Sequence, residues 1–321
     1  MLKIITIGEI LVEIMAKNIG QDFLQPGEFL GPYPSGAPAI FIDQAARMGA
    51  ACGIVARVGE DDFGLLNIAR LKQDGVDTSR IRITPGYTTG TAFVTYFPDG
   101  NRKFIFHFAH SAAGMMRPED IEEDYLKEAI YLHVMGCSLS ASDGMRQAIL
   151  KAIAIAKKHQ IQVTFDPNIR PELLTGGEIN TVFSQVLKAT DILLTGRGEA
   201  LALTVSNTLE TAIFALKSRG IKTIVIKDGA HGVRVYHDQE IIRIPSFPAR
   251  EIDPTGAGDC FDGAFLASLS EGKDVRQAAI IANAAGALSV SQKGPMEGAA
   301  FKENILRFLA DVNHTIPNLN D

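Results

Sequence analysis

The sequence predicts an α/β protein whose central sheet is mainly parallel and is covered by helices on both faces. From residue 118 onward, amphipathic helical stretches alternate with short runs rich in β-branched residues. Repeated αβ units of this kind place their strands parallel to one another. A hairpin pattern near residue 100 interrupts the alternation, so a small β element should project from the main sheet.

Composition limits the classes of function. The chain has 321 residues, 46% hydrophobic and 21% charged, which is ordinary for a globular protein with a substantial core. A net charge of −6 argues against nucleic-acid binding. Cys52, Cys137 and Cys260 are far apart and form no CxxC pair, so no disulfide framework or zinc site is expected. No apolar run of about 18 residues occurs, and we expect a cytoplasmic protein that contacts no membrane.

The first predicted strand is the β-branched run 3–7, which Gly8 closes. Glu9 and Glu13 follow, and carboxylates at a strand end can accept hydrogen bonds from sugar hydroxyls, although a solvated pair explains them equally well. Residues 18–36 are rich in glycine and proline and should be irregular. The pattern then predicts a helix over 38–48, a strand over 53–58 and a second helix that ends at residue 74.

Residues 91–97 and 103–108 alternate around a turn at 98–101, which predicts a β-hairpin. Together with residues 12–33 it would form a small β lid that keeps water from a buried site. His107 and His110 lie at the end of this hairpin. Each is a candidate for substrate contact, but an exposed or structural histidine is the commoner case.

The second half continues the αβ alternation. The predicted helices cover 118–128, 143–159, 178–188 and 208–219. The predicted strands cover 130–135, 161–165, 191–195 and 222–227, with further strands near 233 and 241.

The most informative stretch is Asp253-Pro254-Thr255-Gly256-Ala257-Gly258-Asp259-Cys260-Phe261. A glycine-rich turn that opens a helix exposes unpaired N–H groups at the positive end of the helix dipole, so the N–H groups of Gly256, Ala257 and Gly258 could bind a phosphoryl group. Asp259 stands at this anion hole and could take the proton of an attacking hydroxyl. The alternative is an ordinary helix cap.

The whole nonapeptide resembles the C-terminal signature of the PfkB (ribokinase-like) family of sugar kinases. A second match joins Gly36-Ala37-Pro38-Ala39 and Gly49 to the segment 58–64, and the resemblance extends over about residues 2–310. It implies a ribokinase-like three-layer αβα sandwich with a small β lid. The core would comprise 1–11, 34–87 and 112–312, and the lid 12–33 and 88–111. Many relatives dimerise through this lid, so a homodimer is expected.

The resemblance also assigns sugar-side residues. Glu13, Gly36, Ala37 and His107 would contact the sugar. Arg170, in Asp166-Pro167-Asn168-Ile169-Arg170, would hold a substrate oxygen, a carboxylate or phosphate charge. The alternative is a surface arginine paired with Glu172.

On the nucleotide side, Glu199 matches an acid that acts on magnesium through water, although Gly196 replaces the family's asparagine. Lys227, Gly229 and Gly232 belong to a turn that approaches ribose and phosphates. Asn283 lies in a run, 282–286, that opens an alanine-rich helix beside the adenine, and close helix packing explains this run almost as well. Asp253 begins a loop that holds a monovalent cation, K⁺, in several relatives.

The expected activity is transfer of the γ-phosphate from ATP–Mg²⁺ to a primary hydroxyl of a small sugar. His107 and Phe108 stand where a second arginine lies in the 2-keto-3-deoxygluconate kinases, which favours a neutral ketohexose, fructose- or tagatose-like, over the keto acid. Ile40 and Glu13 differ from the ribokinase pattern, which weakens that assignment. A 2-keto-3-deoxygluconate kinase and a non-catalytic sugar-binding regulator remain the alternatives. No P-loop or protein-kinase motif occurs.

Overall fold

The computed structural model describes residues 1–99, 101–170 and 178–315. In this part of the chain a nine-stranded sheet has the order β13-β12-β11-β10-β9-β8-β1-β4-β5. The strands from β11 to β5 in this order are parallel, and β12 and β13 pair antiparallel at one edge. The strands are β1 (Ile4–Ile7), β4 (Cys52–Gly59), β5 (Ile81–Thr84), β8 (Tyr131–Met135), β9 (Gln162–Asp166), β10 (Ile192–Gly196), β11 (Thr223–Lys227), β12 (Val233–His237) and β13 (Glu240–Ile244).

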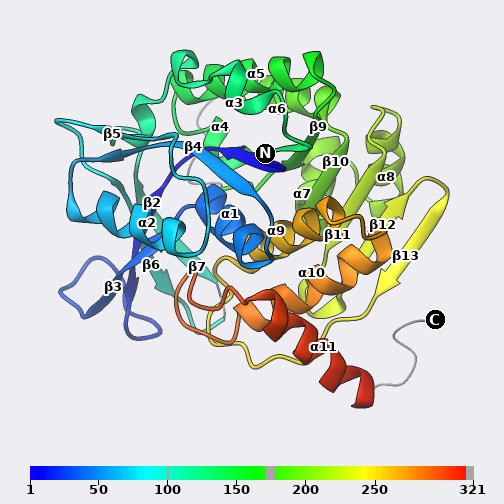
Figure 1. The fold of residues 1–321 in the computed structure, drawn as a ribbon. Helices are drawn as coiled ribbons and strands as arrows, with labels where there is room; N and C mark the ends of the chain where they lie inside the picture. The colour runs from blue at the N-terminus through cyan, green and yellow to red at the C-terminus, as the bar shows by residue number, and fades with distance from the viewer. Residues whose placement is uncertain (100, 171–177, 316–321) are drawn as a thin grey trace.

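Helices cover both faces of this sheet, as Figure 1 shows. One layer contains α1 (Ala37–Arg47), α2 (Asp62–Gln73), α9 (Ala257–Ser270), α10 (Val275–Ser289) and α11 (Lys302–Thr315). The other contains α3 (Glu123–Leu126), α4 (Gly136–Leu139), α5 (Asp143–Lys158), α6 (Glu178–Ala189), α7 (Arg197–Thr204) and α8 (Leu209–Lys217). The predicted three-layer αβα architecture is therefore confirmed.

Two hydrophobic cores separate these layers. Successive side chains of a strand point to opposite faces, so each central strand feeds both cores. Within β10, Ile192 and Leu194 pack with α9 and α10, whereas Leu193 packs with α5 and α6. Parallel strands buried on both faces explain why these segments are continuously apolar in the sequence.

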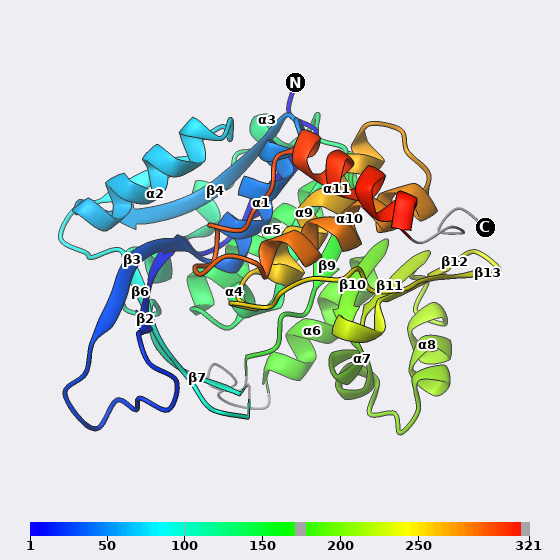
Figure 2. The same ribbon diagram turned by 90° about the horizontal axis from the view of Figure 1, so that it is seen from below.

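The lid is a separate four-stranded sheet of order β3-β2-β6-β7. Its strands are β2 (Leu11–Ala16), β3 (Phe29–Ser35), β6 (Gly90–Tyr96) and β7 (Arg102–His107). Two chain segments about 60 residues apart thus combine, with β2 parallel to β6 and the predicted hairpin β6–β7 at one edge. Figure 2 shows this sheet to one side of the main body.

Four local expectations differ from the structure. Residues 18–36 are not irregular throughout, because β3 within them pairs antiparallel with β2 in the lid. Residues 118–128 do not form one helix: a 3₁₀ turn, Pro118–Asp120, precedes the single turn α3. The Asp120 carboxylate accepts hydrogen bonds from Arg57 Nε (2.7 Å) and Nη2 (2.8 Å), and this tertiary pairing holds the short turn. The helix α10 begins at Val275 after the cap Asp274, so the run 282–286 lies inside it. The short helix α7 was not expected.

No helix within the described ranges is long and apolar enough to cross a bilayer.

Candidate active site

The site is built around the start of α9. Gly256 caps the helix with φ 80°, and a Cβ there would lie 2.4 Å from the Pro295 carbonyl oxygen, so only glycine suits this position. The first intrahelical bond joins the Cys260 N–H to the Gly256 carbonyl oxygen at 2.8 Å. The N–H groups before Cys260 therefore have no partner inside the helix. That of Ala257 makes only a long bond, 3.4 Å, to the Pro254 carbonyl oxygen.

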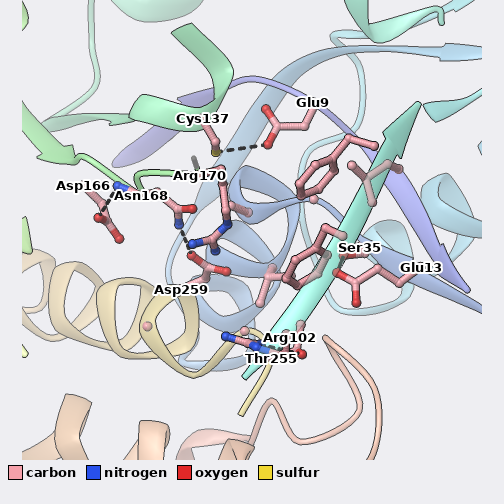
Figure 3. A pocket seen from close by; sticks show the side chains of 18 of the residues that line it. Glu9, Glu13, Ser35, Arg102, Cys137, Asp166, Asn168, Arg170, Thr255 and Asp259 are labelled. Carbon is pink, nitrogen blue, oxygen red and sulfur yellow. Dashed lines mark hydrogen bonds between the residues drawn. The ribbon is translucent and has the colours of Figure 1, made fainter. Parts of the chain in front are cut away.

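A cavity of about 220 Å³ opens between this helix start, the ends of the central strands and the lid (Figure 3). Of the predicted residues it brings together Glu13, Gly36, Ala37, Arg170, Glu199, Lys227, Gly256, Gly258 and Asp259. Segments from one end of the chain to the other supply these residues. They converge because the carboxyl ends of parallel strands lie at one edge of the sheet.

Asp259 is 5% exposed and lies in the first turn of α9. Burial, followed by the nearby charge of Asp166, raises its pKa from the usual 3.8 to about 7, while Arg170 and Lys227 act in the opposite direction. Asn168 Nδ2 donates a 3.0 Å hydrogen bond to Asp259 Oδ1, which fixes the direction of the carboxylate. A carboxylate whose pKa lies near neutrality can accept a proton at physiological pH.

Lys227 is the centre of a buried ion cluster beneath the cavity. Its Nζ donates to Asp166 Oδ2 at 2.9 Å and to both Asp262 oxygens at 3.0 Å. Although burial opposes the charge, these two carboxylates raise the pKa of Lys227 above its usual value. Burial raises the pKa of Asp262 well above its usual value, while the charge of Lys227 acts in the opposite direction. The cluster leaves Lys227 fixed and positive beside Gly258.

Two buried glutamates line the first cavity, which is the predicted sugar cavity. Burial raises the pKa of Glu13 to about 7, and its Oε1 accepts a 2.8 Å hydrogen bond from Ser35 Oγ. Glu13 Oε2 is buried and has no hydrogen-bond partner among the described residues, so a sugar hydroxyl can satisfy it. Glu9 accepts from Ser138 Oγ (2.6 Å) and from Cys137 Sγ (3.3 Å), and burial raises its pKa.

Glu199 is held by backbone donors. Its Oε1 accepts from the Ile169 N–H and its Oε2 from the Gly196 N–H, both at 2.8 Å. Burial raises its pKa, and the charge of Asp166 adds to this. Oε2 also accepts a 3.2 Å hydrogen bond from Thr195 Oγ1, so Oε1 keeps the spare lone pair, which suits a water of a hydrated magnesium ion better than direct coordination. The part of the chain that the structure describes contains no group of three or more His, Cys, Asp or Glu side chains that could hold a metal ion.

A second cavity, of about 520 Å³, lies on the other side of the α9 start. The predicted Gly229, Gly232, Ala257 and Asn283 line it, and Lys227 and Gly258 border both cavities. Asn283 Nδ2 donates to the Pro245 carbonyl oxygen at 2.7 Å, so this side chain also fastens the cavity wall. The two cavities meet where Gly258 has no side chain, at the helix N-terminus.

The remaining predicted residues lie elsewhere. His107 and His110 are exposed, and His107 faces away from the sugar cavity because β7 directs its even-numbered residues inward. The expectation that His107 contacts the sugar therefore disagrees with this structure. Asp253 lines neither cavity: its Oδ1 accepts from the Thr255 N–H and Tyr96 Oη, and its Oδ2 from the Gly294 N–H. The proposed partner of Arg170, Glu172, lies outside the described residues.

Sequence reasoning missed several residues that line the sugar cavity. They are Arg102, Phe104, Phe106, Asp166, Asn168 and, in the cluster beneath it, Asp262. Asn168 and Asp166 belonged to the segment that pointed to Arg170, and their place after β9 was the available signal. Arg102 could have been found from strand alternation, had the inward face of the hairpin been known.

Three comparisons with known proteins agree with this geometry. The family model described as "pfkB family carbohydrate kinase" matches residues 1–301. A 2-dehydro-3-deoxygluconokinase of Thermoproteus tenax is 32% identical over 301 residues, which are 92% of this chain and 91% of the relative.

Two solved structures extend the likeness. A ribokinase II candidate from E. coli, in complex with ATP and Mg²⁺, superposes with a TM-score of 0.92 at 46% identity, covering 97% of this chain and all of that chain (100%). A fructokinase from Vibrio cholerae, with fructose, ADP and calcium bound, has a TM-score of 0.85 at 27% identity, covering 96% of this chain and 99% of the other. The predicted ribokinase-like fold is thereby confirmed.

Proposed function

The chain belongs to the pfkB family of carbohydrate kinases and is an ATP-dependent sugar kinase, and on this premise we propose that it phosphorylates a primary hydroxyl of a neutral ketohexose, fructose- or tagatose-like. The observation that carries the proposal is the position of Asp259. Its buried carboxylate lies in the smaller cavity, one residue from the Gly258 boundary with the larger one. A hydroxyl held beside Asp259 therefore faces a phosphate held at the helix N-terminus.

The proposed reaction uses the residues in order. Asp259 accepts the proton as the sugar oxygen attacks the γ-phosphorus, and Asn168 keeps the carboxylate aimed at that oxygen. The N–H groups of Gly256, Ala257 and Gly258 stabilise charge on the transferring group. Phosphoryl transfer has a loose transition state, so proton removal can come late and a weak base suffices.

The nucleotide would occupy the larger cavity, against the turn of Gly229 and Gly232 and the α10 face that carries Asn283. Lys227, which borders both cavities, would face the phosphates. Mg²⁺ bound through water to Glu199 would neutralise phosphate charge. Asp253 Oδ2, which accepts one hydrogen bond among the described residues, keeps a lone pair for a monovalent cation such as K⁺.

The lining of the sugar cavity favours a neutral sugar. The lid contributes three phenylalanines, Phe104, Phe106 and Phe108, and these suit the apolar face of a sugar ring. Glu9 and Glu13 offer acceptors for hydroxyls, and in their ionised forms they would repel a substrate carboxylate.

A sugar acid is the second candidate. Arg102 and Arg170 both line the cavity, and a guanidinium binds a carboxylate in a bidentate manner. The 2-dehydro-3-deoxygluconokinase relative supports this candidate.

The test measures ADP release with ATP–Mg²⁺ against fructose, tagatose, 2-keto-3-deoxygluconate, ribose and a nucleoside. Turnover on a neutral ketohexose alone is the expected result. Turnover on the keto acid alone would transfer the proposal to the second candidate. No turnover on any of them would contradict both and favour an untested sugar or a regulator.

We also propose that the chain is divided into a core (1–11, 34–87 and 112–312) and a lid (12–33 and 88–111). Two chains would form a homodimer through their lids. The outer lid face (Ile14, Phe29, Phe93 and Ile105) is apolar, and Phe29 and Ile105 are 38% and 47% exposed. Sedimentation should show a dimer that Ile105→Glu dissociates. The control Ile241→Glu, at a residue 48% exposed on β13, should leave it intact.

A further inference from the structure

Arg102 has an unusual position in the lid. The strand β7 directs Arg102, Phe104 and Phe106 into the sugar cavity, followed by Phe108, while its odd-numbered residues Lys103 and Ile105 are exposed. Arg102 is the one charged member of this inward row. It lies at the end of the strand nearest to the anion hole rather than at the end where Phe108 packs into the core.

The guanidinium of Arg102 reaches the loop that forms the anion hole. Its Nη1 donates a 2.9 Å hydrogen bond to Thr255 Oγ1, and Thr255 directly precedes the helix cap Gly256. In Figure 3 Arg102 and Thr255 lie together below the carboxylate of Asp259. A residue of the lid and the N–H groups of α9 therefore face the same small volume, on the side where the transferring phosphoryl group would pass.

The charge of Arg102 has no close ion-pair partner in the described part of the chain, although at longer range it partly opposes the burial that raises the pKa of Glu13. No salt bridge of Arg102 is found among residues 1–99, 101–170 and 178–315, and its other short-range contact is with the Phe104 ring, 5.6 Å away. Lys227, by comparison, is held by two carboxylates at 2.9 and 3.0 Å. A guanidinium has five N–H donors in a planar fork, so most of those on Arg102 remain for a ligand.

We propose that Arg102 is a catalytic residue that the lid delivers to the transferring phosphoryl group; this inference rests on the proposed kinase function. In the transfer, the sugar oxygen forms a bond to the γ-phosphorus, and the bond from that phosphorus to the bridging oxygen breaks. The electron pair of the broken bond leaves with ADP, and the sugar proton passes to Asp259. Arg102 stabilises the charge that spreads over the equatorial phosphoryl oxygens during this step.

The assignment links lid closure to chemistry. Arg102 belongs to the lid, whereas Thr255 and Gly256 belong to the core. The phosphoryl group would thus meet its full set of donors only when the lid covers the sugar. Hydrolysis of ATP by water would therefore be slow while the lid is open, because the charge on the phosphoryl group is then incompletely stabilised.

The test compares Arg102→Met and Arg102→Lys with Lys103→Met, which removes the neighbouring outward-facing cation. For Arg102→Met we expect kcat to fall roughly 10²- to 10³-fold with KM for the sugar within about threefold, because one transition-state donor is lost. Arg102→Lys should recover only part of the rate, since an ammonium lacks the planar fork. Added guanidinium ion should raise the rate of an Arg102→Ala variant.

A second measurement does not depend on which sugar is used. Binding of ADP with aluminium fluoride, a mimic of the transferring group, should weaken at least tenfold in Arg102→Met, while binding of ADP alone should not change. A large rise in sugar KM with unchanged kcat would overturn the proposal and assign Arg102 to a substrate carboxylate. Equal losses in Lys103→Met, or unchanged aluminium fluoride binding, would overturn it as well.

Failure of the proposed kinase function can be distinguished from failure of the Arg102 assignment. The unaltered protein would then show no sugar-dependent ADP release, whereas the aluminium fluoride measurement would still decide whether Arg102 contacts the phosphoryl position.

Discussion

Replacing Asp259 by asparagine should remove turnover and, at the same time, stabilise the folded protein at neutral and higher pH. Burial first, and the charge of Asp166 second, raise the pKa of this carboxyl from 3.8 to about 7. Between these two values the folded state binds a proton that the unfolded state has lost. Stability therefore falls as pH rises through this window, and the folded protein carries the full cost of the buried charge above about pH 7.

The size of the effect follows from the two pKa values. Each pH unit between them corresponds to about 1.4 kcal/mol, so ionisation of Asp259 costs about 4 kcal/mol above pH 7. At pH 5 the cost is about 1.6 kcal/mol by the same relation. An amide has no such cost, although it can still accept the hydrogen bond from Asn168. The stability advantage of Asp259→Asn should thus grow by about 3 kcal/mol between pH 5 and pH 8.

Urea unfolding at both pH values measures this difference directly. The control is Asp22→Asn, at an exposed residue whose Oδ1 accepts a 2.9 Å hydrogen bond from the Leu24 N–H, which an asparagine oxygen can also accept. This control should change the free energy of unfolding little and equally at both pH values. An advantage of Asp259→Asn that is the same at pH 5 and pH 8 would refute the reasoning, because packing, rather than ionisation, would then be responsible.

Three further outcomes are expected. For the unaltered enzyme, kcat/KM should fall about tenfold per pH unit below pH 7, because protonated Asp259 is no base; a flat profile down to pH 5.5 would contradict this. Gly258→Ala should unfold at the normal urea concentration, because its Cβ would make an ordinary 3.4 Å contact with Lys227 Nζ, but it should lose turnover because that Cβ fills the place where the two cavities meet. Gly256→Ala should unfold at a lower urea concentration, because its φ is 80° and its Cβ would lie 2.4 Å from the Pro295 carbonyl oxygen. Lys227→Met should cost about 3–5 kcal/mol in urea unfolding by leaving buried carboxylates unpaired, and a second change, Asp262→Asn, should recover part of this loss.

Local patterns predicted most of the fold because the αβ units are strongly periodic. The helix α5 and the hairpin β6–β7 lie within one residue of the expected bounds. The helix expected over 118–128 did not form, because its Asp120 pairs with Arg57, about 60 residues away in the chain. A single sequence contains no signal for such a tertiary ion pair.

The site likewise combines local features that the sequence could predict with tertiary features that it could not. The glycine turn and Asp259 could be predicted because their chemistry lies within seven consecutive residues. The inward face of the hairpin could not, because both faces of β7 carry large apolar side chains, Phe106 on one and Ile105 on the other. The alternation was predicted correctly, but nothing in it distinguished the face of Arg102 from the face of His107.

The burial of α9 has a consequence for how the enzyme loses activity. Residues 259–268 form an unbroken buried run packed between α1 and α10, so the anion hole is the half-buried end of a core helix rather than part of a surface loop. Such a helix cannot shift or unravel on its own without opening the hydrophobic core. Heat should therefore abolish catalysis and melt the core at the same temperature, and rearrangements during turnover should be confined to the lid.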